Sequence, residues 1–264
     1  MKEMILSKGR DIQFQFDENG LAQTEILPGH SEDLQIFRCI LKAGHTWHPE
    51  LFGLEEKVQI FAFITPYDGL HYNGYFTTNE AAYNIEGYTT FIPEFDTDKN
   101  IFIHAGVKDL QFYRFLGRFN EWDQARYKYQ HYSLPNTRNF VKNGVQYTEE
   151  FTGMAGSNLR QYIQVEGKSL GRWSMGYNVG EGPTFIGTHT HSDVEQWYFI
   201  LPGSSFTYTT AQGEVELEEY DITYTDMGVP HGSKAKNGQK IDYFWLELCT
   251  RGYEHTSVKG KPAS

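Results

Sequence analysis

Three potential metal ligands lie close together in one segment of the sequence that reads as extended. His189 and His191 are two residues apart, and Glu195 follows four residues later. Side chains in a β-strand alternate between the two faces, so the two histidines share one face. Glu195 has the same parity and joins them if the chain stays near-extended through a bend at Ser192-Asp193. Two imidazoles and one carboxylate on a concave face would form most of a site for a first-row transition metal.

A fourth ligand must come from another strand, and His231 is the best candidate. It follows a tight turn over residues 226–230, in which Gly228 can adopt the positive φ that such a turn needs. Pro230 fixes the backbone just before the imidazole. A lone histidine is usually a surface or core residue, but this combined pattern is more specific. We therefore expect one divalent transition metal ion, of manganese, iron, nickel, cobalt or zinc, bound by His189, His191, Glu195 and His231.

Metal binding by these residues implies a pH dependence and a lined pocket. Imidazole must be neutral to bind a metal, so affinity is expected to fall as the pH drops through about 6.5. Trp197 and Phe199 share the parity of Glu195 and are expected to line the pocket. A catalytic site would also need a general acid or base. Strand parity alone suggests four candidates on other strands, and core packing is the alternative for each tyrosine: Tyr177, Tyr208, Tyr243 and Glu247.

These motifs resemble those of the cupin superfamily. The first cupin motif reads Gly, five residues, HxH, three or four residues, Glu, six residues, Gly. His189, His191 and Glu195 fit its ligand positions, while Gly182 and Gly203 are each displaced by one residue from its glycine positions. The second motif is Gly, five residues, PxG, two residues, His, three residues, Asn, and its end fits Gly228 and His231. The sequence departs from it at turn positions rather than at ligands, namely at Tyr220, Asp226 and Ala235. The resemblance implies a small antiparallel barrel of two sheets with the metal inside its mouth.

Strand signals extend along the whole chain, and one of them recurs. Aromatic residues make up 16% of the 264 residues, and apolar or alternating stretches separated by turn residues predict an all-β protein. The segment 58–66 (VQIFAFITP) matches 194–202 (VEQWYFILP) at an offset of 136 residues, which indicates a duplicated unit. We therefore expect two tandem cupin jelly-roll (double-stranded β-helix) barrels, over residues 1–135 and 136–264, with the boundary near Pro135. Residues 119–144 lie between the copies, and the first part of this stretch is compatible with a short helix.

The first copy resembles the same fold without its ligands. The 136-residue offset places His189, His191 and Glu195 on Gly53, Glu55 and Gln59, and the second motif puts Asp98 where His231 stands. Such a set suits a borderline metal poorly, so the first barrel is expected to bind no metal. An offset site remains an alternative to exposed loop positions for three nearby histidines: His45, His48 and His104.

The overall composition narrows the classes of partner. The net charge is −11 with histidine neutral, which disfavours nucleic acid and anionic membrane surfaces as partners. We find no apolar run long enough to span a bilayer and no signal-peptide core. Cys39 and Cys249 sit in apolar stretches and are expected to be buried free thiols in a cytoplasmic protein. A small-molecule substrate is the expected partner, and a homodimer is compatible with the aromatic excess.

Three functions are compatible with such a site, because one fold supports many chemistries. The first is a metal-dependent enzyme of isomerase type acting on a sugar, a keto acid or an enediol. The second is an iron or nickel dioxygenase acting on an aromatic or enediol substrate. The third is a non-catalytic protein that binds a metal or another ligand, in which the metal is structural and its coordination closed.

Overall fold

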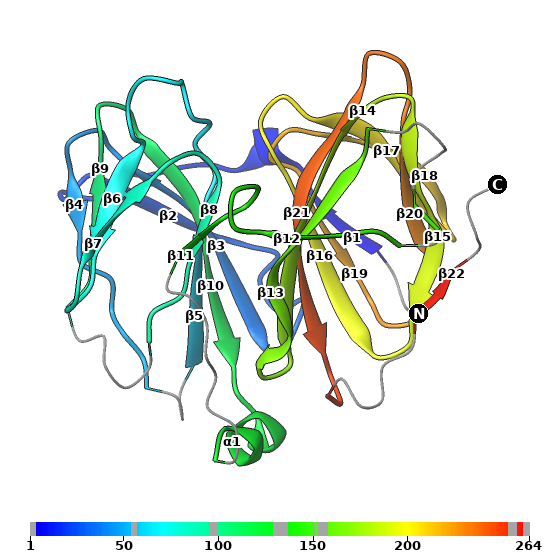
Figure 1. Ribbon diagram of the computed structural model, residues 1–264, viewed down its shortest axis with the longest axis horizontal. Helices are drawn as coiled ribbons and strands as arrows, with labels where there is room; N and C mark the ends of the chain where they lie inside the picture. The colour runs from blue at the N-terminus through cyan, green and yellow to red at the C-terminus, as the bar shows by residue number, and fades with distance from the viewer. Residues whose placement is uncertain are drawn as a thin grey trace. The chain divides into compact units, whose positions relative to one another are not determined.

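The chain folds into two compact β units. The computed structural model describes residues 4–53, 57–94, 100–128, 137–149, 151–152, 158–252 and 258–260. One unit comprises residues 12–143, and the other comprises residues 144–264 together with the first eleven residues (Figure 1). The prediction of an all-β chain with two tandem barrels is confirmed. The boundary, however, lies after Asn143 rather than near Pro135.

Strand pairing explains this difference in the boundary. β11 (Thr137–Asn139) pairs with β8 (Thr89–Phe91), so the segment just after Pro135 completes a sheet of the first unit. β1 (Met4–Ser7) pairs with β19 (Ile222–Thr225), so the start of the chain belongs to the second unit. Hydrogen bonding across sequence separations of this size has no local signature, and the sequence therefore gave no sign of either pairing.

The N-terminal unit contains two antiparallel sheets. The six-stranded sheet has the order β11-β8-β5-β10-β3-β2, and the four-stranded sheet has the order β4-β9-β6-β7. The remaining strands of this unit are β2 (Leu21–Ile26), β3 (Leu34–Leu41), β4 (Thr46–Trp47), β5 (Lys57–Phe63), β6 (Gly74–Thr77), β7 (Ala82–Ile85), β9 (Phe102–Ala105) and β10 (Leu110–Arg118).

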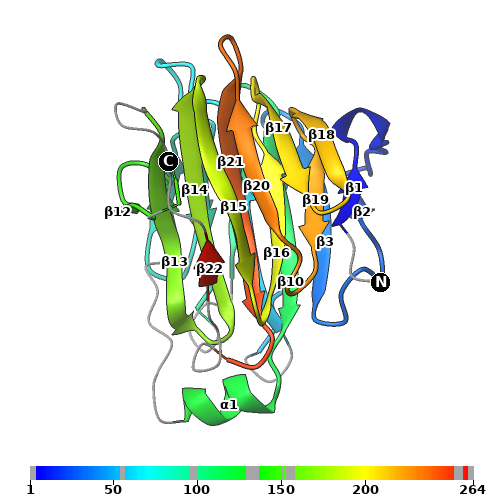
Figure 2. The same cartoon turned by 90° about the vertical axis from the view of Figure 1, so that its right-hand side faces the viewer.

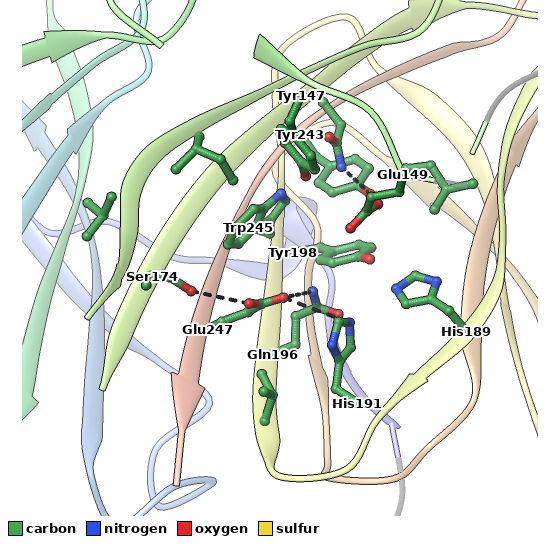
Figure 3. Close-up of a pocket in the computed structure, with 16 residues that line it drawn as sticks. Tyr147, Glu149, Ser174, His189, His191, Gln196, Tyr198, Tyr243, Trp245 and Glu247 are labelled. Atoms are coloured by element: carbon green, nitrogen blue, oxygen red, sulfur yellow. Dashed lines mark hydrogen bonds and ion pairs between the residues drawn. The ribbon is translucent and has the colours of Figure 1, made fainter. Parts of the chain in front are cut away.

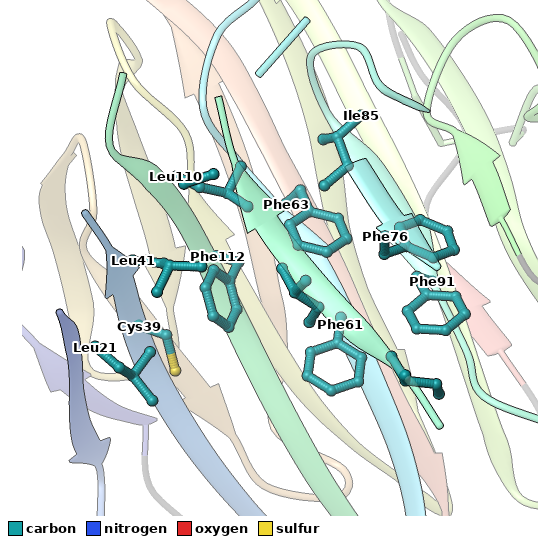
Figure 4. Packing of buried hydrophobic residues seen from close by; sticks show 13 residues of the cluster. Leu21, Cys39, Leu41, Phe61, Phe63, Phe76, Ile85, Phe91, Leu110 and Phe112 are labelled. Carbon is teal, nitrogen blue, oxygen red and sulfur yellow. The ribbon is translucent and has the colours of Figure 1, made fainter. Parts of the chain in front are cut away.

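Stacked phenylalanine rings fill the space between these two sheets (Figure 4). Phe76 on one sheet and Phe91 on the other stack with their ring centroids 3.9 Å apart. Phe61, Phe63 and Phe112 lie in the same buried cluster, in which each of them is fully buried. Each such ring contributes about 1.5–3 kcal/mol through burial. Aromatic packing of this kind leaves the interior of the N-terminal unit tightly filled.

A short helix follows the last long strand of the N-terminal unit. The helix α1 (Glu121–Tyr127) begins with a capping box, in which Asn120 accepts from the backbone of Asp123 and Asp123 accepts from the backbone of Asn120. This confirms the short helix expected in the first part of residues 119–144. A single turn of 3-10 helix, η1 (Gly9–Asp11), follows β1.

The C-terminal unit also consists of two antiparallel sheets. One has the order β12-β13-β14-β21-β16-β19-β1, and the other has the order β18-β17-β20-β15-β22. A single residue pair, Ser205 with Lys240, links them. The strands not yet bounded are β12 (Val145–Tyr147), β13 (Arg160–Leu170), β14 (Trp173–Glu181), β15 (Thr184–His191), β16 (Val194–Ile200), β17 (Ser205–Thr210), β18 (Gly213–Glu218), β20 (His231–Ala235), β21 (Lys240–Cys249) and β22 (Val258–Gly260).

The chain passes from one of these sheets to the other between β15 and β16, as their different neighbours show (Figure 2). Only residues 192 and 193 separate these two strands. Asp193 is buried at this corner, where its carboxylate accepts from Arg251 and from Ser192 Oγ. The backbone oxygen of Asp193 also accepts from the amide of Thr250. The corner is therefore held firmly, and β16 begins a new sheet rather than continuing β15.

The register between the two copies differs from the one that the sequence match gave. Phe61 and Phe63 of β5 point into the N-terminal core, whereas Tyr198 and Ile200 of β16 point into the C-terminal core. Inward residues are thus odd-numbered in β5 and even-numbered in β16, and an even offset cannot superimpose them. The 136-residue offset is wrong by one residue for this strand, and a slip of one residue exchanges the two faces of a strand.

Two further observations bear on the sequence-based expectations. Both cysteines, Cys39 and Cys249, are buried and free, as predicted. Within the described part of the chain, no helix has the length and apolar character needed to cross a membrane.

Candidate metal centre and pocket

Three histidines meet on the inner face where β15 pairs with β20. His189 and His231 are direct partners across the two strands. Ile186 pairs with Ser233, so three steps along β15 match two steps along β20, and the extra residue forms a β-bulge. The bulge turns both Ile186 and His189 toward the interior, although they have opposite parity.

Two glycines permit this bulge because backbone fills the space that a side chain would need. A Cβ on Gly187 would lie 2.6 Å from the carbonyl oxygen of Phe151, and a Cβ on Gly232 would lie 2.9 Å from that of Ile186. The amide of Gly187 also donates to the carbonyl oxygen of Phe151 at 2.8 Å. The close backbone approach at Gly187 and Gly232 therefore fixes the direction in which His189 and His231 point.

The potential ligand atoms of His189, His191 and His231 all lie within 4.8 Å of one another. The ring Nδ1 of His189 lies 2.8 Å from the carbonyl oxygen of Gly187, and that of His231 lies 2.9 Å from the carbonyl oxygen of Val229. A carbonyl can only accept, so each Nδ1 carries the proton and each Nε2 keeps its lone pair. Such a backbone contact orients metal-binding histidines in many proteins.

Two of the Nε2 atoms are buried with no hydrogen-bond partner among the described residues, namely those of His191 and His231. An unsatisfied buried nitrogen is costly, and a metal ion would satisfy it. The three imidazoles therefore form a site that fits a transition metal ion.

Burial also keeps these imidazoles neutral. The pKa values of His189 and His191 are lowered to about 4, mainly by burial, and at His189 proximity to His191 also contributes. The pKa of His231 is lowered well below its ordinary value, first by burial and then by the other two histidines. Neutral imidazole is the form that binds a metal, so the site is ready for binding at neutral pH.

The turn before His231 has the geometry expected from the sequence. Gly228 has φ +73°, and its amide donates to the carbonyl oxygen of His191 at 2.8 Å. This bond connects the turn to the strand that carries two of the ligands. Tyr220 stands where the second cupin motif has glycine and adopts φ +67°, a conformation that costs a non-glycine residue energy.

Glu195 does not join the histidines, and its predicted place in the site is wrong. It is absent from the histidine cluster, although it lies in the described part of the chain. It accepts a hydrogen bond from the hydroxyl of Tyr224, whose ring packs against that of Trp197. The physical reason is the sheet-to-sheet corner at residues 192 and 193, which breaks the assumed extended path and its parity.

Trp197 and Phe199 share the face of Glu195 and are likewise misassigned as pocket residues. Both are fully buried, but neither borders the pocket beside the histidines. Phe199 instead stacks on Phe244 of β21 with centroids 4.6 Å apart. The inward residues of this strand at the pocket are Val194, Gln196 and Tyr198.

Gln196 and Glu247 occupy the position beside the metal centre that Glu195 was expected to fill. They are paired residues of β16 and β21, and Gln196 Nε2 donates to Glu247 Oε1 at 2.6 Å (Figure 3). Glu247 Oε1 also lies 3.9 Å from His191 Nε2, and Ser174 Oγ donates to its Oε2. The side-chain amide oxygen of Gln196, Oε1, is buried with no partner among the described residues. A carboxylate is thus present at the site, but it comes from β21.

A cavity of about 310 Å³ opens on one side of His189 and His191. Of the four proposed catalytic candidates, Tyr243 and Glu247 border this cavity. Tyr208 is buried behind it and forms a hydrogen bond with Thr225. Tyr177 points to the opposite face, where it donates to Asp242 at 2.9 Å. The structure therefore removes Tyr177 and Tyr208 from the pocket.

Sequence reasoning missed the segment at the start of the C-terminal unit. Tyr147 and Glu149 border the cavity, and Phe151 stacks on the His189 ring with centroids 4.4 Å apart. Burial raises the pKa of Glu149 to about 7, and Gln161 donates to its carboxylate at 3.1 Å. Burial likewise raises the pKa of Glu247 to about 7. Apart from its aromatic residues, this segment carried no motif that could have marked it.

The motif positions of the N-terminal unit can be followed only in part. Glu55 and Asp98 lie outside the described residues. Gln59 is buried, and its side-chain oxygen Oε1 accepts from Arg114 Nε at 2.6 Å. His48 stacks on Phe102, and His104 stacks on Tyr75. Within the described ranges, the histidines of this unit form no cluster of the metal-binding type; these are His30, His45, His48, His71 and His104.

Two tandem jelly-roll barrels, the second with a three-histidine site, give this chain the fold that its cupin-like motifs implied. The resemblance seen in the sequence is therefore confirmed at the level of fold.

Comparison with solved structures gives the same result. An oxalate decarboxylase mutant from Bacillus subtilis aligns with a TM-score of 0.68 and 11% identity, covering 98% of this chain and 80% of the other. A protein from Pseudomonas aeruginosa described as glyoxylate-induced aligns with a TM-score of 0.68 and 12% identity, covering 92% and 88%. No protein-family model and no curated protein sequence matches this chain. Identities this low establish the fold and leave the reaction open.

Proposed function

We propose that this protein is a metal-dependent enzyme that isomerises a small oxygenated metabolite, such as a sugar, a keto acid or an enediol. The observation that carries the proposal is the position of Glu247 beside the three-histidine site. Its carboxylate lies 3.9 Å from His191 Nε2, and it borders the same cavity as His189 and His191. A metal site, a carboxylate and a substrate-sized cavity thus share one space.

The three histidines would hold the metal through their Nε2 atoms. A bound divalent ion supplies polarisation of a substrate oxygen, which makes a neighbouring C–H group more acidic. Gln196 Oε1 is a further oxygen that could face the ion, because its amide nitrogen is already held by Glu247. This arrangement would keep the amide of Gln196 in one orientation.

The protein's own groups could then move the protons that isomerisation requires. Glu247 would take the proton from the carbon next to the carbonyl and return it to the neighbouring carbon. Ser174 and Gln196 hold its two oxygens in place. Glu149 would exchange the hydroxyl proton, since burial brings its pKa to about 7, close to the value at which a group both gives and takes protons at neutral pH.

A single experiment separates the three functions left open by the sequence. The full-length protein would be loaded in turn with manganese, iron, cobalt, nickel or zinc and incubated in D2O without oxygen with a panel of aldoses, ketoses and keto acids. We expect a metal-dependent shift of the carbonyl group with deuterium at the adjacent carbon, detected by NMR. His231→Ala should abolish turnover, and Glu247→Gln should lower kcat by about 100-fold or more.

The contrary outcomes are equally distinct. In parallel incubations of the same panel with oxygen, oxygen consumption that tracks product formation would favour the dioxygenase and contradict isomerisation. Saturable binding without turnover of any compound, for every metal, would favour the non-catalytic protein. Glu195→Gln is the matched control, since it alters a nearby carboxylate that faces Tyr224 rather than the cavity.

A further inference from the structure

The polar wall of the pocket consists mainly of hydrogen-bond acceptors. Asn178 Nδ2 donates to the hydroxyl of Tyr243 at 2.9 Å, which leaves Asn178 Oδ1 buried with no partner among the described residues. Gln196 shows the same pattern, because its nitrogen is used by Glu247 and its oxygen is unpaired. Asn178 and Gln196 are 3% and 4% exposed, so water reaches these side chains very little. Both amides thus leave an acceptor at the pocket wall.

The two carboxyl groups of the pocket add further acceptor capacity. Glu149 accepts from Gln161 through Oε2, and Glu247 accepts from Ser174 and Gln196. Each carboxylate oxygen can accept two hydrogen bonds, so both groups can accept more from a ligand. Whether ionised or protonated, neither group carries a positive charge.

The described residues that border this acceptor-rich wall include no cationic side chain. None of the described residues that border the cavity is a lysine or an arginine. Arg172 and Arg251, which flank the wall strands β14 and β21, are engaged elsewhere: Arg172 donates to the carbonyl oxygen of Thr250, and Arg251 pairs with Asp193. Arg160, in the wall strand β13, is exposed and does not border the cavity. A carboxylate or phosphate group on a substrate normally meets arginine or lysine in its binding site. Here such a group would meet acceptors, and among the described residues at the wall it would find no cationic partner other than a bound metal.

Aromatic rings complete the wall and suit the carbon skeleton of a ligand. Tyr147 accepts a hydrogen bond from Trp245, which fixes these two rings together at the cavity. Tyr198 stacks on Tyr243 with centroids 4.2 Å apart. Rigid apolar faces with a few oriented polar atoms are typical of small-molecule sites.

From this wall we infer that the pocket selects an uncharged, hydroxyl-rich ligand of sugar or polyol type and discriminates against carboxylated and phosphorylated ligands. Hydroxyl groups can donate to Asn178, Gln196, Glu149 and Glu247, whereas a small dicarboxylate has only acceptors to offer. The inference rests on the proposed function in placing the substrate in this pocket, and it narrows the substrate class from oxygenated metabolites in general to neutral ones.

Matched ligand pairs test this selectivity directly. Zinc-loaded full-length protein would be titrated with neutral aldoses and polyols, with the uronate or aldonate counterpart of each compound, and with oxalate. Saturation-transfer NMR would detect binding, and calorimetry would measure the affinities. At least one neutral compound should bind, and it should bind at least tenfold more tightly than its carboxylate counterpart. Equal or tighter binding of the carboxylates or of oxalate would overturn the inference, as would the absence of binding by every neutral compound.

A variant of the pocket wall provides the second measurement. Glu149→Gln replaces an acceptor oxygen with a donor nitrogen and should weaken neutral-ligand binding by about threefold to tenfold. The difference in affinity between neutral ligands and their carboxylate counterparts should become smaller. The matched control is Glu214→Gln, because Glu214 is an exposed carboxylate of β18 that pairs with Lys234. Equal selectivity in the wild type and in Glu149→Gln would contradict the role of this wall.

The two proposals fail in different ways. Binding of neutral sugars without any turnover would contradict the isomerase and leave the selectivity intact. Metal-dependent isomerisation of a carboxylated compound would support the enzyme and overturn the selectivity.

Discussion

Gln196 and Glu247 face each other across paired strands, and a hydrogen bond of 2.6 Å joins them beside the three-histidine site. The pair places an amide and a carboxylate on the inner face of the barrel, at the level where the sequence led us to expect Glu195. Glu195 itself lies on the other face, in contact with Tyr224. The site therefore keeps a carboxylate near the imidazoles but takes it from a different strand.

Loss of one imidazole should remove the metal without unfolding the barrel. His231→Ala is expected to lower the bound metal to less than a tenth of the wild-type content, because the other two histidines alone bind a transition metal weakly. Elemental analysis after dialysis measures the content, and circular dichroism checks the fold. His104→Ala, in the N-terminal unit, serves as the control and should retain its metal. Full metal content in His231→Ala would show that the ion binds elsewhere.

The corrected orientation of β16 predicts opposite effects for neighbouring residues. Glu195→Gln should leave the metal affinity within about twofold of the wild-type value. Gln196→Ala or Glu247→Gln should lower the affinity by about 10-fold to 100-fold, as is typical of groups that hold metal ligands in place. Competition with a chromophoric chelator gives these affinities. A large loss in Glu195→Gln, with Gln196→Ala unaffected, would restore the parity assumed from the sequence.

Metal retention should extend to lower pH than the ordinary pKa of histidine suggests. Burial lowers the pKa of His189 and His191 to about 4, so protons compete with the metal only near that pH rather than near 6.5. We expect nearly full metal content at pH 5.5 and release as the pH falls through about 4. Dialysis over a pH series, with circular dichroism at each step, separates release from unfolding. Release centred at pH 6.5 in folded protein would indicate exposed imidazoles.

Because of Glu149, the metal-free protein should have a larger free energy of unfolding at mildly acid pH than at alkaline pH, as far as this group contributes. Its pKa is raised from 4.5 to about 7 by burial, so between these values the folded state binds more protons than the unfolded state. The unfavourable contribution of Glu149 is present above pH 7 and disappears as the pH falls to 4.5. Relative to wild type, Glu149→Gln should gain about 1–3 kcal/mol in unfolding free energy at pH 8 and less at pH 5. Urea unfolding at both values, with Glu214→Gln as control, tests this difference.

The bulge that aims His189 should be sensitive to a single methyl group. Gly187→Ala places a Cβ 2.6 Å from the carbonyl oxygen of Phe151, so the bulge must shift. We expect a loss of about 1–3 kcal/mol in stability together with weaker metal binding. Gly53→Ala is the control, since a Cβ there meets no atom within 4 Å. Unchanged metal affinity in Gly187→Ala would show that the bulge does not set the direction of the imidazole.

Much of the fold and three of the four expected ligands could be derived from the sequence. Apolar alternation and turn residues reveal strands because both are local properties of the chain. The HxH pair and the histidine after the Gly228 turn are likewise recognisable by spacing, and the structure brings all three together. The repeated strand indicated two barrels, although its register was wrong by one residue.

What only the tertiary structure decided is the face on which each residue of β16 lies. Parity holds along a continuous strand, but the chain changes sheets at residues 192 and 193, and a bulge shifts β15 by one residue. Because the side-chain period is two, either event exchanges inward and outward residues. The contacts that fix them come from Arg251, Thr250 and Phe151, which lie far along the chain from the bulge or the corner. Spacing alone therefore identified the imidazoles, while long-range packing chose Gln196 and Glu247 over Glu195.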